Sequence, residues 1–391
     1  MATTYNVPVN YQIIIPHSVS FGVGALNVLG TEVKKMKAQQ VLIVTGPDVF
    51  RSGLVQPVKE QLSKAMVSMD IFTEAEREPT LLGLNKAASR LKNSKYDAII
   101  GVGGGSSIDT AKGLSVLLAH GGQGQDYLGT DKIPGPGIVV IAIPTTAGTG
   151  SEVTNIAVFS DTEKELKVAM VSPHLLARVA LIDPILTYTC PPGVTAAAGI
   201  DALVHAIECY TSRKANNFTD ALAVKAMQLI SGNLKTAVND SPNKDARNAM
   251  AEGAMLAGIA FGNSGVAAVH ALAYPLGARF HVSHGVANGL LLSHVMEYNL
   301  SADPPKFAAI TTALGKSTKG LTPLRAAEKG VTTVKTLVRD IGLPSRLRDL
   351  GVPKDALEDM AVATMDVTRL LANNPKTLTL DDVRHIWENA W

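Results

Sequence analysis

The sequence predicts an α/β half over residues 1–190, built on a doubly wound, mostly parallel sheet, followed by an all-α half over residues 191–391. Two observations carry this prediction. Short apolar runs alternate with helical patterns in the first half, which is typical of strands buried on both faces of a parallel sheet. From about Thr195 these runs largely disappear, and Ala, Leu, Met and Lys recur at helical spacing. Cys190-Pro-Pro-Gly193 marks the boundary, because prolines and glycine end regular elements.

Six strands are expected in the α/β half, and each is a short β-rich run. They cover Tyr11–Ile15, Val41–Gly46, Val67–Phe72, Asp97–Gly103, Gly137–Pro144 and Val179–Asp183. Helical patterns lie between them near residues 49–65, 80–93 and 107–119. This alternation predicts a doubly wound sheet, in which ligands bind at the carboxyl ends of the strands.

The composition of the chain is that of a globular protein long enough for two sizeable cores. Its 391 residues are 46% hydrophobic and 18% charged, with a net charge of +2. Lysine and arginine are scattered, so we expect neither a nucleic acid nor a membrane as partner. No apolar stretch reaches the ~18 residues that span a bilayer, and no signal-peptide pattern opens the chain. Two cysteines, Cys190 and Cys209, favour reduced thiols in a cytoplasm over a disulfide framework.

Two polar loops follow neighbouring strands of the expected sheet. The first, Gly103-Gly-Gly-Ser106, runs from a strand into a helix. Glycines let backbone N–H groups approach a pyrophosphate, and the N-terminus of a helix adds partial positive charge. Ser106 and Ser107 are also ordinary N-cap residues, so helix initiation explains part of the pattern. The second loop is Pro144-Thr-Thr-Ala-Gly-Thr149. From these residues alone, nucleotide binding and plain polar turns are both open.

The helical half contains a carboxylate and three imidazoles in apolar surroundings. Asp201 and His205 are four residues apart, which places them on one face of a helix. His270 lies in a second helical stretch, and His284 follows in a turn-like Ser-His-Gly. Buried charges need partners or a metal, and this ligand set suits Fe²⁺ or Zn²⁺. The structural alternative is a surface Asp-x-x-x-His pair, which the apolar neighbours disfavour.

Gly199-Ile-Asp-Ala-Leu-Val-His-Ala-Ile-Glu208 resembles one signature of the iron-containing (group III) alcohol dehydrogenases. His270-Ala-Leu-Ala-Tyr-Pro-Leu-Gly277, with His284-Gly-Val-Ala-Asn288, resembles the other. With the two loops, the match runs in order over nearly the whole chain. The resemblance implies an enzyme that transfers a hydride between NAD or NADP and a primary or small secondary alcohol or its aldehyde. It implies a homodimer or higher homo-oligomer, with the metal, Fe²⁺ or alternatively Zn²⁺, held by Asp201, His205, His270 and His284.

The resemblance also implies a set of contacts to the nicotinamide cofactor. These residues are Gly46, Gly103, Gly104, Gly105, Ser106, Asp109, Thr145, Thr146, Thr149, Lys167 and Leu186. Gly46 is a departure, because NAD-preferring members carry an aspartate there that holds the adenosine ribose. Glycine removes a carboxylate that would repel a 2′-phosphate, which predicts relaxed or NADP-tolerant selectivity. No lysine or arginine nearby in the sequence clearly clamps that phosphate. Glu78 is a second departure, because the family usually has asparagine in this Asn-Pro-Thr motif.

Tyr274 is the candidate catalytic residue, since it replaces the second histidine of the family's usual His-x-x-x-His-Pro. A phenol with an unperturbed pKa near ~10 is a poor base at neutral pH. We therefore expect Tyr274 to form a wall of the substrate pocket, with donation of a hydrogen bond as the alternative. His281 is a candidate neighbour of the proton path, although an ordinary loop histidine is the expected role.

Two other enzyme classes and a non-catalytic binding protein are the competing functions. Dehydroquinate-synthase-like lyases use NAD and a metal without net redox change, but they need several basic residues to hold a phosphorylated sugar acid. Arg279 is the only lysine or arginine in the segments 199–208 and 270–288. Glycerol dehydrogenases are nearer relatives that usually lack one of the four ligands. In a non-catalytic binding protein, the four metal ligands and the two cofactor loops would have no role, which disfavours this function.

Overall fold

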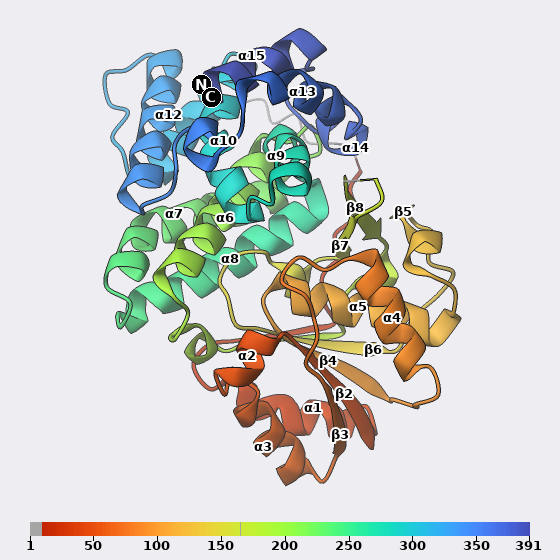
Figure 1. Cartoon of the computed structure of the whole chain (residues 1–391). Helices are drawn as coiled ribbons and strands as arrows, with labels where there is room; N and C mark the ends of the chain where they lie inside the picture. The colour runs from red at the N-terminus through yellow and green to blue at the C-terminus, as the bar shows by residue number, and fades with distance from the viewer. Residues whose placement is uncertain (1–9, 165) are drawn as a thin grey trace.

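The computed structural model describes residues 10–164 and 166–391, and within them an α/β half lies beside a half made of helices (Figure 1). The described part of the α/β half contains a six-stranded parallel sheet in the order β1-β9-β6-β4-β2-β3. Its strands are β1 (Ser18–Phe21), β2 (Gln40–Thr45), β3 (Ser68–Phe72), β4 (Ala98–Gly103), β6 (Val139–Pro144) and β9 (Val179–Ile182). The fold class predicted from the sequence is confirmed.

Helices cover both faces of this sheet, which explains the continuous apolar runs of its strands. They are α1 (Leu29–Lys35), α2 (Pro47–Arg51), α3 (Gln56–Ala65), α4 (Leu81–Leu91) and α5 (Gly105–His120). Along β2, Val41 and Ile43 join the core formed with α1 and α3, whereas Leu42 and Val44 join the core formed with α4 and α5. Alternate strand residues point to opposite faces, so all four are buried. The helix expected over 49–65 is two helices, with Gly53 at φ +80° between them.

The first expected strand, Tyr11–Ile15, is wrong, because this run forms no strand in the described residues. The backbone N–H of Ile14 donates to Oδ1 of Asn263 at 2.6 Å, and Nδ2 of Asn263 donates to the Ile14 carbonyl at 3.0 Å. A side-chain amide on a helix therefore takes the place of a neighbouring strand. The edge strand of the sheet is instead β1, which pairs in parallel with β9.

A second sheet of three strands, within the described residues, was not predicted from the sequence. It contains β5 (Gly129–Thr130), β7 (Ile156–Asp161) and β8 (Leu166–Val171) in the order β5-β8-β7, and β7 and β8 are antiparallel. β7 alternates buried and half-buried side chains, as a strand with one covered face does. This sheet brings β8 against the helical half.

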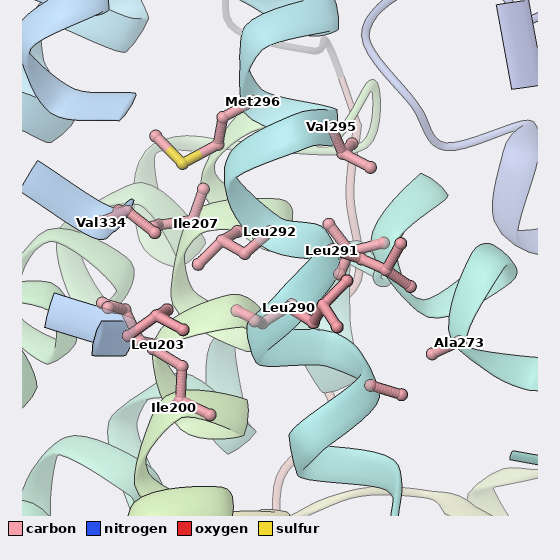
Figure 2. Packing of buried hydrophobic residues seen from close by; sticks show 14 of the residues in the cluster. Ile200, Leu203, Ile207, Ala273, Leu290, Leu291, Leu292, Val295, Met296 and Val334 are labelled. Atoms are coloured by element: carbon pink, nitrogen blue, oxygen red, sulfur yellow. The ribbon is translucent and has the colours of Figure 1, made fainter. Parts of the chain in front are cut away.

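The described part of the chain beyond Pro192 forms helices and connections only. The helices are α6 (Pro192–Thr211), α7 (Asn217–Asn239), α8 (Lys244–Ser264), α9 (Ala268–Phe280), α10 (His284–Asn299), α11 (Pro304–Ala313), α12 (Pro323–Asp340), α13 (Leu357–Met365), α14 (Thr368–Leu371) and α15 (Leu380–Ala390). Figure 2 shows α10 in the middle of their shared core, with Leu203 of α6, Ala273 of α9 and Val334 of α12 around it. α6, α9 and α10 are thus fixed relative to one another by apolar packing.

The described helices include no single one that is long and apolar enough to cross a membrane. α8 and α9 meet that requirement only when their lengths are joined, and their axes are bent by 102° at the break.

The loop after β6 is one of the places where the two halves meet. A Cβ on Gly150 would lie 2.5 Å from Cα of Gly258 in α8, and a Cβ on Gly148 would lie 2.7 Å from Cβ of Ala198 in α6. Since Cβ atoms do not approach other atoms so closely, glycine is required at both loop positions. The loop predicted to contact a nucleotide therefore packs directly against the helices that carry the predicted metal ligands.

Candidate metal and cofactor site

Helix α6 places Asp201 and His205 on one buried face, as their spacing predicts. Nε2 of His205 lies 3.9 Å from Oδ2 of Asp201, and both side chains are almost fully buried. The imidazole of His205 stacks on the ring of Phe261 in α8, with ring centroids 4.2 Å apart. A neighbouring helix thus holds the ring of His205 beside the carboxylate.

Helices α9 and α10 bring two further histidines to the same carboxylate. Nε2 of His270 lies 3.8 Å from Oδ1 of Asp201, and Nε2 of His284 lies 3.9 Å from the same oxygen. Ligand atoms of Asp201, His270 and His284 all lie within 4.8 Å of one another. His205 adjoins this group through Asp201 and through its ring, which stacks on His270 at 4.8 Å between centroids. The structure thus gathers the three predicted histidine ligands around the carboxylate of the fourth, Asp201.

The cluster has the chemistry of a cation site. Among the residues that the structure describes, nothing hydrogen-bonds to the buried Nε2 of His270. A buried polar atom without a partner costs about 1–3 kcal/mol, which a bound cation would offset. Burial lowers the pKa of His205 and of His284 to about 4, so both rings are neutral at pH 7, the form that binds metals. Burial raises the pKa of Asp201, but the surrounding histidines and Asn288 outweigh it and lower the pKa overall. A neutral-imidazole and carboxylate set fits Fe²⁺ or Zn²⁺.

Glu208 lies beside the ligand cluster, and the sequence analysis assigned no role to it. Its Oε2 lies 2.6 Å from Nδ1 of His270 and accepts from the N–H of Ala267 at 3.0 Å, and its Oε1 accepts from the N–H of Val269 at 2.6 Å. The carboxylate therefore caps the start of α9 and fixes which ring nitrogen of His270 faces Asp201. Glu208 follows Asp201 by seven residues, two helical turns, and that spacing on an apolar helix is the signal that could have found it.

Asn288 is a second such residue, one turn after His284 on α10. Its Nδ2 lies 2.6 Å from Oδ1 of Asp201 and 3.1 Å from Nε2 of His284. The amide thus links a carboxylate on α6 to an imidazole on α10. It sets the distance between two of the four predicted ligands.

The two nucleotide loops lie side by side at the carboxyl edge of the sheet, since β4 and β6 are neighbours. Gly103 pairs in register with Pro144, and the N–H of Thr145 donates to the Gly103 carbonyl at 2.9 Å. Gly103 has φ +151°, and a Cβ there would lie 2.4 Å from Oγ of Ser107. Only glycine meets both conditions, because L residues avoid this φ region.

Further contacts join the tips of these loops. A Cβ on Gly104 would lie 3.4 Å from Oγ1 of Thr146, and a Cβ on Gly105 would lie 2.7 Å from Oγ1 of Thr149. Ser106 is half-buried in the first turn of α5. The predicted cofactor residues of both loops thus lie next to one another, and Gly104, Ser106, Thr146 and Thr149 give them a partly exposed surface of backbone amides and hydroxyls. Such a surface suits a pyrophosphate.

Two of the predicted cofactor residues, Asp109 and Leu186, have buried side chains. Oδ1 of Asp109 accepts from Oγ of Ser151 at 2.5 Å, and its Oδ2 accepts from the N–H of Val158 at 2.9 Å. Both carboxylate oxygens thus tie α5 to the segment after the second loop. Leu186 follows β9 at the same edge of the sheet, but its side chain is only 3% exposed and belongs to the core beside α1 and α3. The structure gives Asp109 and Leu186 supporting positions.

Lys112 is a further buried residue without a predicted role. Its ammonium donates to the carbonyls of Ser151, Thr154 and Ile156 at 2.6, 2.8 and 2.8 Å. Burial lowers the pKa of Lys112 to about 8, and burial raises the pKa of the neighbouring Glu152 to about 7. With Asp109, Lys112 fastens the nucleotide helix α5 to residues 151–158.

Lys167 lies on β8 between the two halves. Its ammonium pairs with the carboxylate of Glu78, and its side chain is only 10% exposed. A Cβ on Gly277 of α9 would lie 3.7 Å from Cε of Lys167. The predicted cofactor lysine is therefore close to the helical half and is engaged by the residue that departs from the family's asparagine.

Tyr274 lies one turn after His270 on α9 and is almost fully buried. Its ring centroid is 6.4 Å from that of His284, so it borders the ligand cluster. Burial raises the pKa of its phenol. His281 ends the same helix with φ +54° and an exposed side chain, as expected for a loop histidine.

Comparison with known proteins assigns nearly the whole chain to one family. The model for "Iron-containing alcohol dehydrogenase" matches residues 16–184, and the model for "Fe-containing alcohol dehydrogenase family, C-terminal" matches residues 195–391. The chain is similar to long-chain-alcohol dehydrogenase 1 of Geobacillus thermodenitrificans, with 43% identity over 97% of this chain and 96% of the relative. It is similar to the NAD-dependent methanol dehydrogenase of Bacillus methanolicus, with 36% identity over 96% of this chain and 98% of the relative. The crystal structure of a 1,3-propanediol oxidoreductase matches with a TM-score of 0.95 and 36% identity, over 98% of this chain and 100% of that one.

Proposed function

The chain belongs to the iron-containing alcohol dehydrogenase family, and from that premise we propose which of its residues carry out the reaction. The chain is a metal-dependent oxidoreductase that transfers a hydride between a nicotinamide cofactor and an alcohol or aldehyde. The observation that carries the residue assignment is the convergence of three imidazoles on the buried carboxylate of Asp201. The role proposed for each residue follows from its position relative to Asp201.

Asp201, His205, His270 and His284 hold the metal in this proposal, with Fe²⁺ expected and Zn²⁺ as the alternative. A divalent ion at this place supplies a Lewis acid for the alcohol or carbonyl oxygen. Glu208 presents His270 in the required orientation, and Asn288 holds Asp201 and His284 at a fixed separation. These contacts prepare the ligands before the ion arrives, which reduces the cost of ordering them on binding.

The nucleotide is held by the two loops at the carboxyl edge of the sheet. Gly103, Gly104, Gly105 and Ser106 present backbone amides to its pyrophosphate, and Thr145, Thr146 and Thr149 line the facing side. Gly46 lies beside the ribose, and Lys167 lies toward the helical half. NAD or NADP supplies the hydride acceptor or donor. The contact of the second loop with α6 and α8 supports this assignment, because α6 carries two of the residues proposed to hold the metal.

Tyr274 and Phe261 form the wall of the substrate pocket beside the ligand cluster. Both belong to one buried apolar group, and the ring of Phe261 stacks on His205. Burial raises the pKa of Tyr274, so its phenol keeps its proton at neutral pH and is a poor base there. Leu272 and Leu276 are fully buried in the main helical core instead. An apolar wall suits a primary alcohol, and two relatives, long-chain-alcohol dehydrogenase 1 and the NAD-dependent methanol dehydrogenase, support this substrate class by their names.

A lyase is disfavoured by the same geometry. Arg279 is the basic residue of the signature segments, and its Nη1 lies 3.7 Å from Oδ2 of Asp359 in α13. A carboxylate on another helix thus competes for the guanidinium that a phosphorylated sugar acid would need. An oxidoreductase needs no such cluster of basic residues.

The decisive experiment follows NADH and NADPH oxidation against a panel of aldehydes, using enzyme reconstituted with Fe²⁺ or Zn²⁺. We expect oxidation that depends on the metal. His270→Ala should lose most of its metal by elemental analysis, whereas the matched variant His281→Ala, at an exposed histidine just beyond the opposite end of α9, should keep it. Full metal content in His270→Ala would refute the ligand assignment, and no oxidation by wild-type enzyme with any aldehyde would refute the function.

Assembly and location are further proposals. A homodimer or higher homo-oligomer is supported by β1, an edge strand of the sheet followed by Val23 with 62% of its surface exposed. A cytoplasmic location is supported by the two thiols of Cys190 and Cys209, which are unpaired in the described structure. Light scattering of the purified chain tests the first proposal.

A further inference from the structure

Three charged side chains, Asp48, Arg51 and Arg77, meet at the carboxyl end of β2, and the reaction described so far does not use them. Nε and Nη2 of Arg77 donate to Oδ2 of Asp48 at 2.8 and 2.5 Å, and Nη2 of Arg51 donates to Oδ1 of Asp48. The side chains of Arg77 and Arg51 are 85% and 68% exposed. A guanidinium has five N–H donors, so each arginine retains donors beyond those that Asp48 occupies.

This trio adjoins the nucleotide edge of the sheet. The N–H of Ala75 donates to the carbonyl of Thr45 at 3.2 Å, which fastens the segment that carries Arg77 to the end of β2. A Cβ on Gly46 would lie 3.2 Å from the Ala75 carbonyl oxygen and 3.8 Å from Oγ of Ser107. Gly46 therefore lies between that segment and the first turn of α5, which follows the glycine loop. Asp48 is two residues beyond Gly46.

The charge balance of the trio favours an anion. Two guanidinium groups and one carboxylate leave one net positive charge. The hydrogen bond from Arg77 lowers the pKa of Asp48, so its carboxylate stays ionised and holds both arginines in place. Exposed ion pairs are weak, whereas two arginines can bind a dianionic phosphate through several charge-assisted hydrogen bonds. A phosphate can therefore displace the carboxylate.

We propose that Arg51 and Arg77 bind the 2′-phosphate of NADP and are the residues that allow this chain to use NADP. The assignment rests on the proposed function, because it requires the nucleotide to lie along the glycine loop. Gly46 has no side chain to fill the space between the ribose and the two arginines. The arginines bind the phosphate, a role that could not be predicted from their positions in the sequence. Arg77 reaches this place from a segment 29 residues beyond Asp48.

The test separates the 2′-phosphate from the rest of the nucleotide. Adenosine 2′,5′-bisphosphate and 5′-AMP are titrated by calorimetry into the metal-loaded enzyme. In Arg77→Ala and Arg51→Ala, the bisphosphate should bind about tenfold or more weakly, and 5′-AMP within about twofold of wild type. Arg77→Lys should recover part of the loss, because it keeps the charge without the planar fork. Asp48→Asn should tighten the bisphosphate, because it removes the competing carboxylate.

Arg90→Ala is the matched control. Arg90 is an exposed arginine of the same half, and it pairs with Glu74 at 2.7 Å. Its loss changes the net charge equally and should leave both affinities unchanged. Inorganic phosphate added alone should compete weakly with the bisphosphate. Competition as strong as that of the bisphosphate itself would show a general anion patch and overturn the assignment.

Steady-state kinetics distinguishes failure of this inference from failure of the proposed function. We expect Arg77→Ala to raise the KM for NADPH by about tenfold or more and to leave the KM for NADH and the kcat unchanged. If the KM values for NADPH and NADH changed equally, or not at all, the role of the arginines would be refuted. The proposed dehydrogenase function would be unaffected. If wild-type enzyme oxidised neither cofactor with any aldehyde, the proposed function itself would be wrong.

Discussion

Glu208 is the residue whose position decides how His270 meets its neighbours. Its carboxylate accepts three hydrogen bonds, two from the start of α9 and one from the imidazole. Glu208→Gln keeps the size of the side chain but offers one oxygen in place of two. We expect metal affinity to fall about 10- to 100-fold, which a competitive titration against a chelator would measure.

The control for Glu208 is Glu297→Gln on α10. Glu297 is an exposed glutamate that pairs with Lys335 at 3.0 Å. It should keep the metal affinity of wild type. Unchanged affinity in Glu208→Gln would reduce Glu208 to a helix cap without influence on the ligand. Rescue by Glu208→Asp is not expected, because the shorter side chain cannot reach both α9 and His270.

Tyr274 is assigned to the pocket wall, and its hydroxyl is the only group that Tyr274→Phe removes. Because burial raises the pKa of this phenol, loss of the hydroxyl should leave kcat nearly unchanged at neutral pH. Tyr274→Ala should instead change the KM and the size of alcohol accepted. A fall in kcat of ~10²-fold or more in Tyr274→Phe, with metal content intact, would make the tyrosine a proton donor or acceptor.

Glu78 forms an ion pair with Lys167, which would otherwise be free to contact a cofactor phosphate. The carboxylate is half exposed, whereas Lys167 is mostly buried, so the pair restrains the lysine. Glu78→Asn restores the residue usual in the family and frees the ammonium. We expect the KM values for NADH and NADPH to fall together by about two- to tenfold with kcat unchanged.

Glu74→Asn is the matched change for Glu78, because it removes one carboxylate from the same segment, where it pairs with Arg90. It should leave both KM values unaltered. If the KM values stayed the same or rose in Glu78→Asn, the ion pair would hold Lys167 in an orientation that favours cofactor binding.

At the scale of elements, Lys112 joins α5 to the segment after the second nucleotide loop. Lys112→Met would leave three buried carbonyls unpaired and two carboxylates, Asp109 and Glu152, without their cation. Breaking a buried charge cluster costs roughly 3–5 kcal/mol. Urea unfolding followed by circular dichroism should show this loss. Lys86→Met, at an exposed lysine of α4, should cost less than about 1 kcal/mol. A similar small loss in Lys112→Met would show that Asp109 and Glu152 are protonated in the folded state.

Spacing within one element was the part of the site that sequence could predict. Asp201 and His205 lie one helical turn apart, so their shared face follows from the helix alone. The two loops were predictable as neighbours at one edge because both follow strands of a parallel sheet. Leu186 also follows a strand, but whether its side chain turns to the loops or to the core depends on packing by α1 and α3.

Contacts between elements that are distant along the chain could not be predicted from the sequence. Arg77 and Asp48 belong to segments that follow different strands, and only the pairing of β2 with β3 brings those segments together. The hydrogen bond of Glu208 to His270 likewise requires the packing of α6 against α9. The second sheet was missed because the apolar runs of its strands are short and adjoin polar residues, Ser160 and Asp161 in β7 and Lys167 in β8.

At the scale of the molecule, the proposed metal and nucleotide sites belong to different halves of the chain. The metal ligands lie on α6, α9 and α10, and the glycine and threonine loops follow β4 and β6. A ligand that binds only the folded protein stabilises it by about 2.7 kcal/mol at 100 times its Kd. We therefore expect Zn²⁺ added to metal-free enzyme to slow hydrogen exchange first in α6, α9 and α10. NADP should slow it first in the two loops and the start of α5.

The loop after β6 should respond to both ligands, because it packs on α6 at Ala198 and on α8 at Gly258. Its amides, over residues 145–150, should therefore be slowed by Zn²⁺ alone, by NADP alone and most by the two together. His270→Ala should abolish the effect of Zn²⁺ on this loop and keep that of NADP. If Zn²⁺ slowed exchange equally in β2, β4 and the helices, the halves would open as one unit. The contact at Gly150 would then be too rigid to separate the two responses.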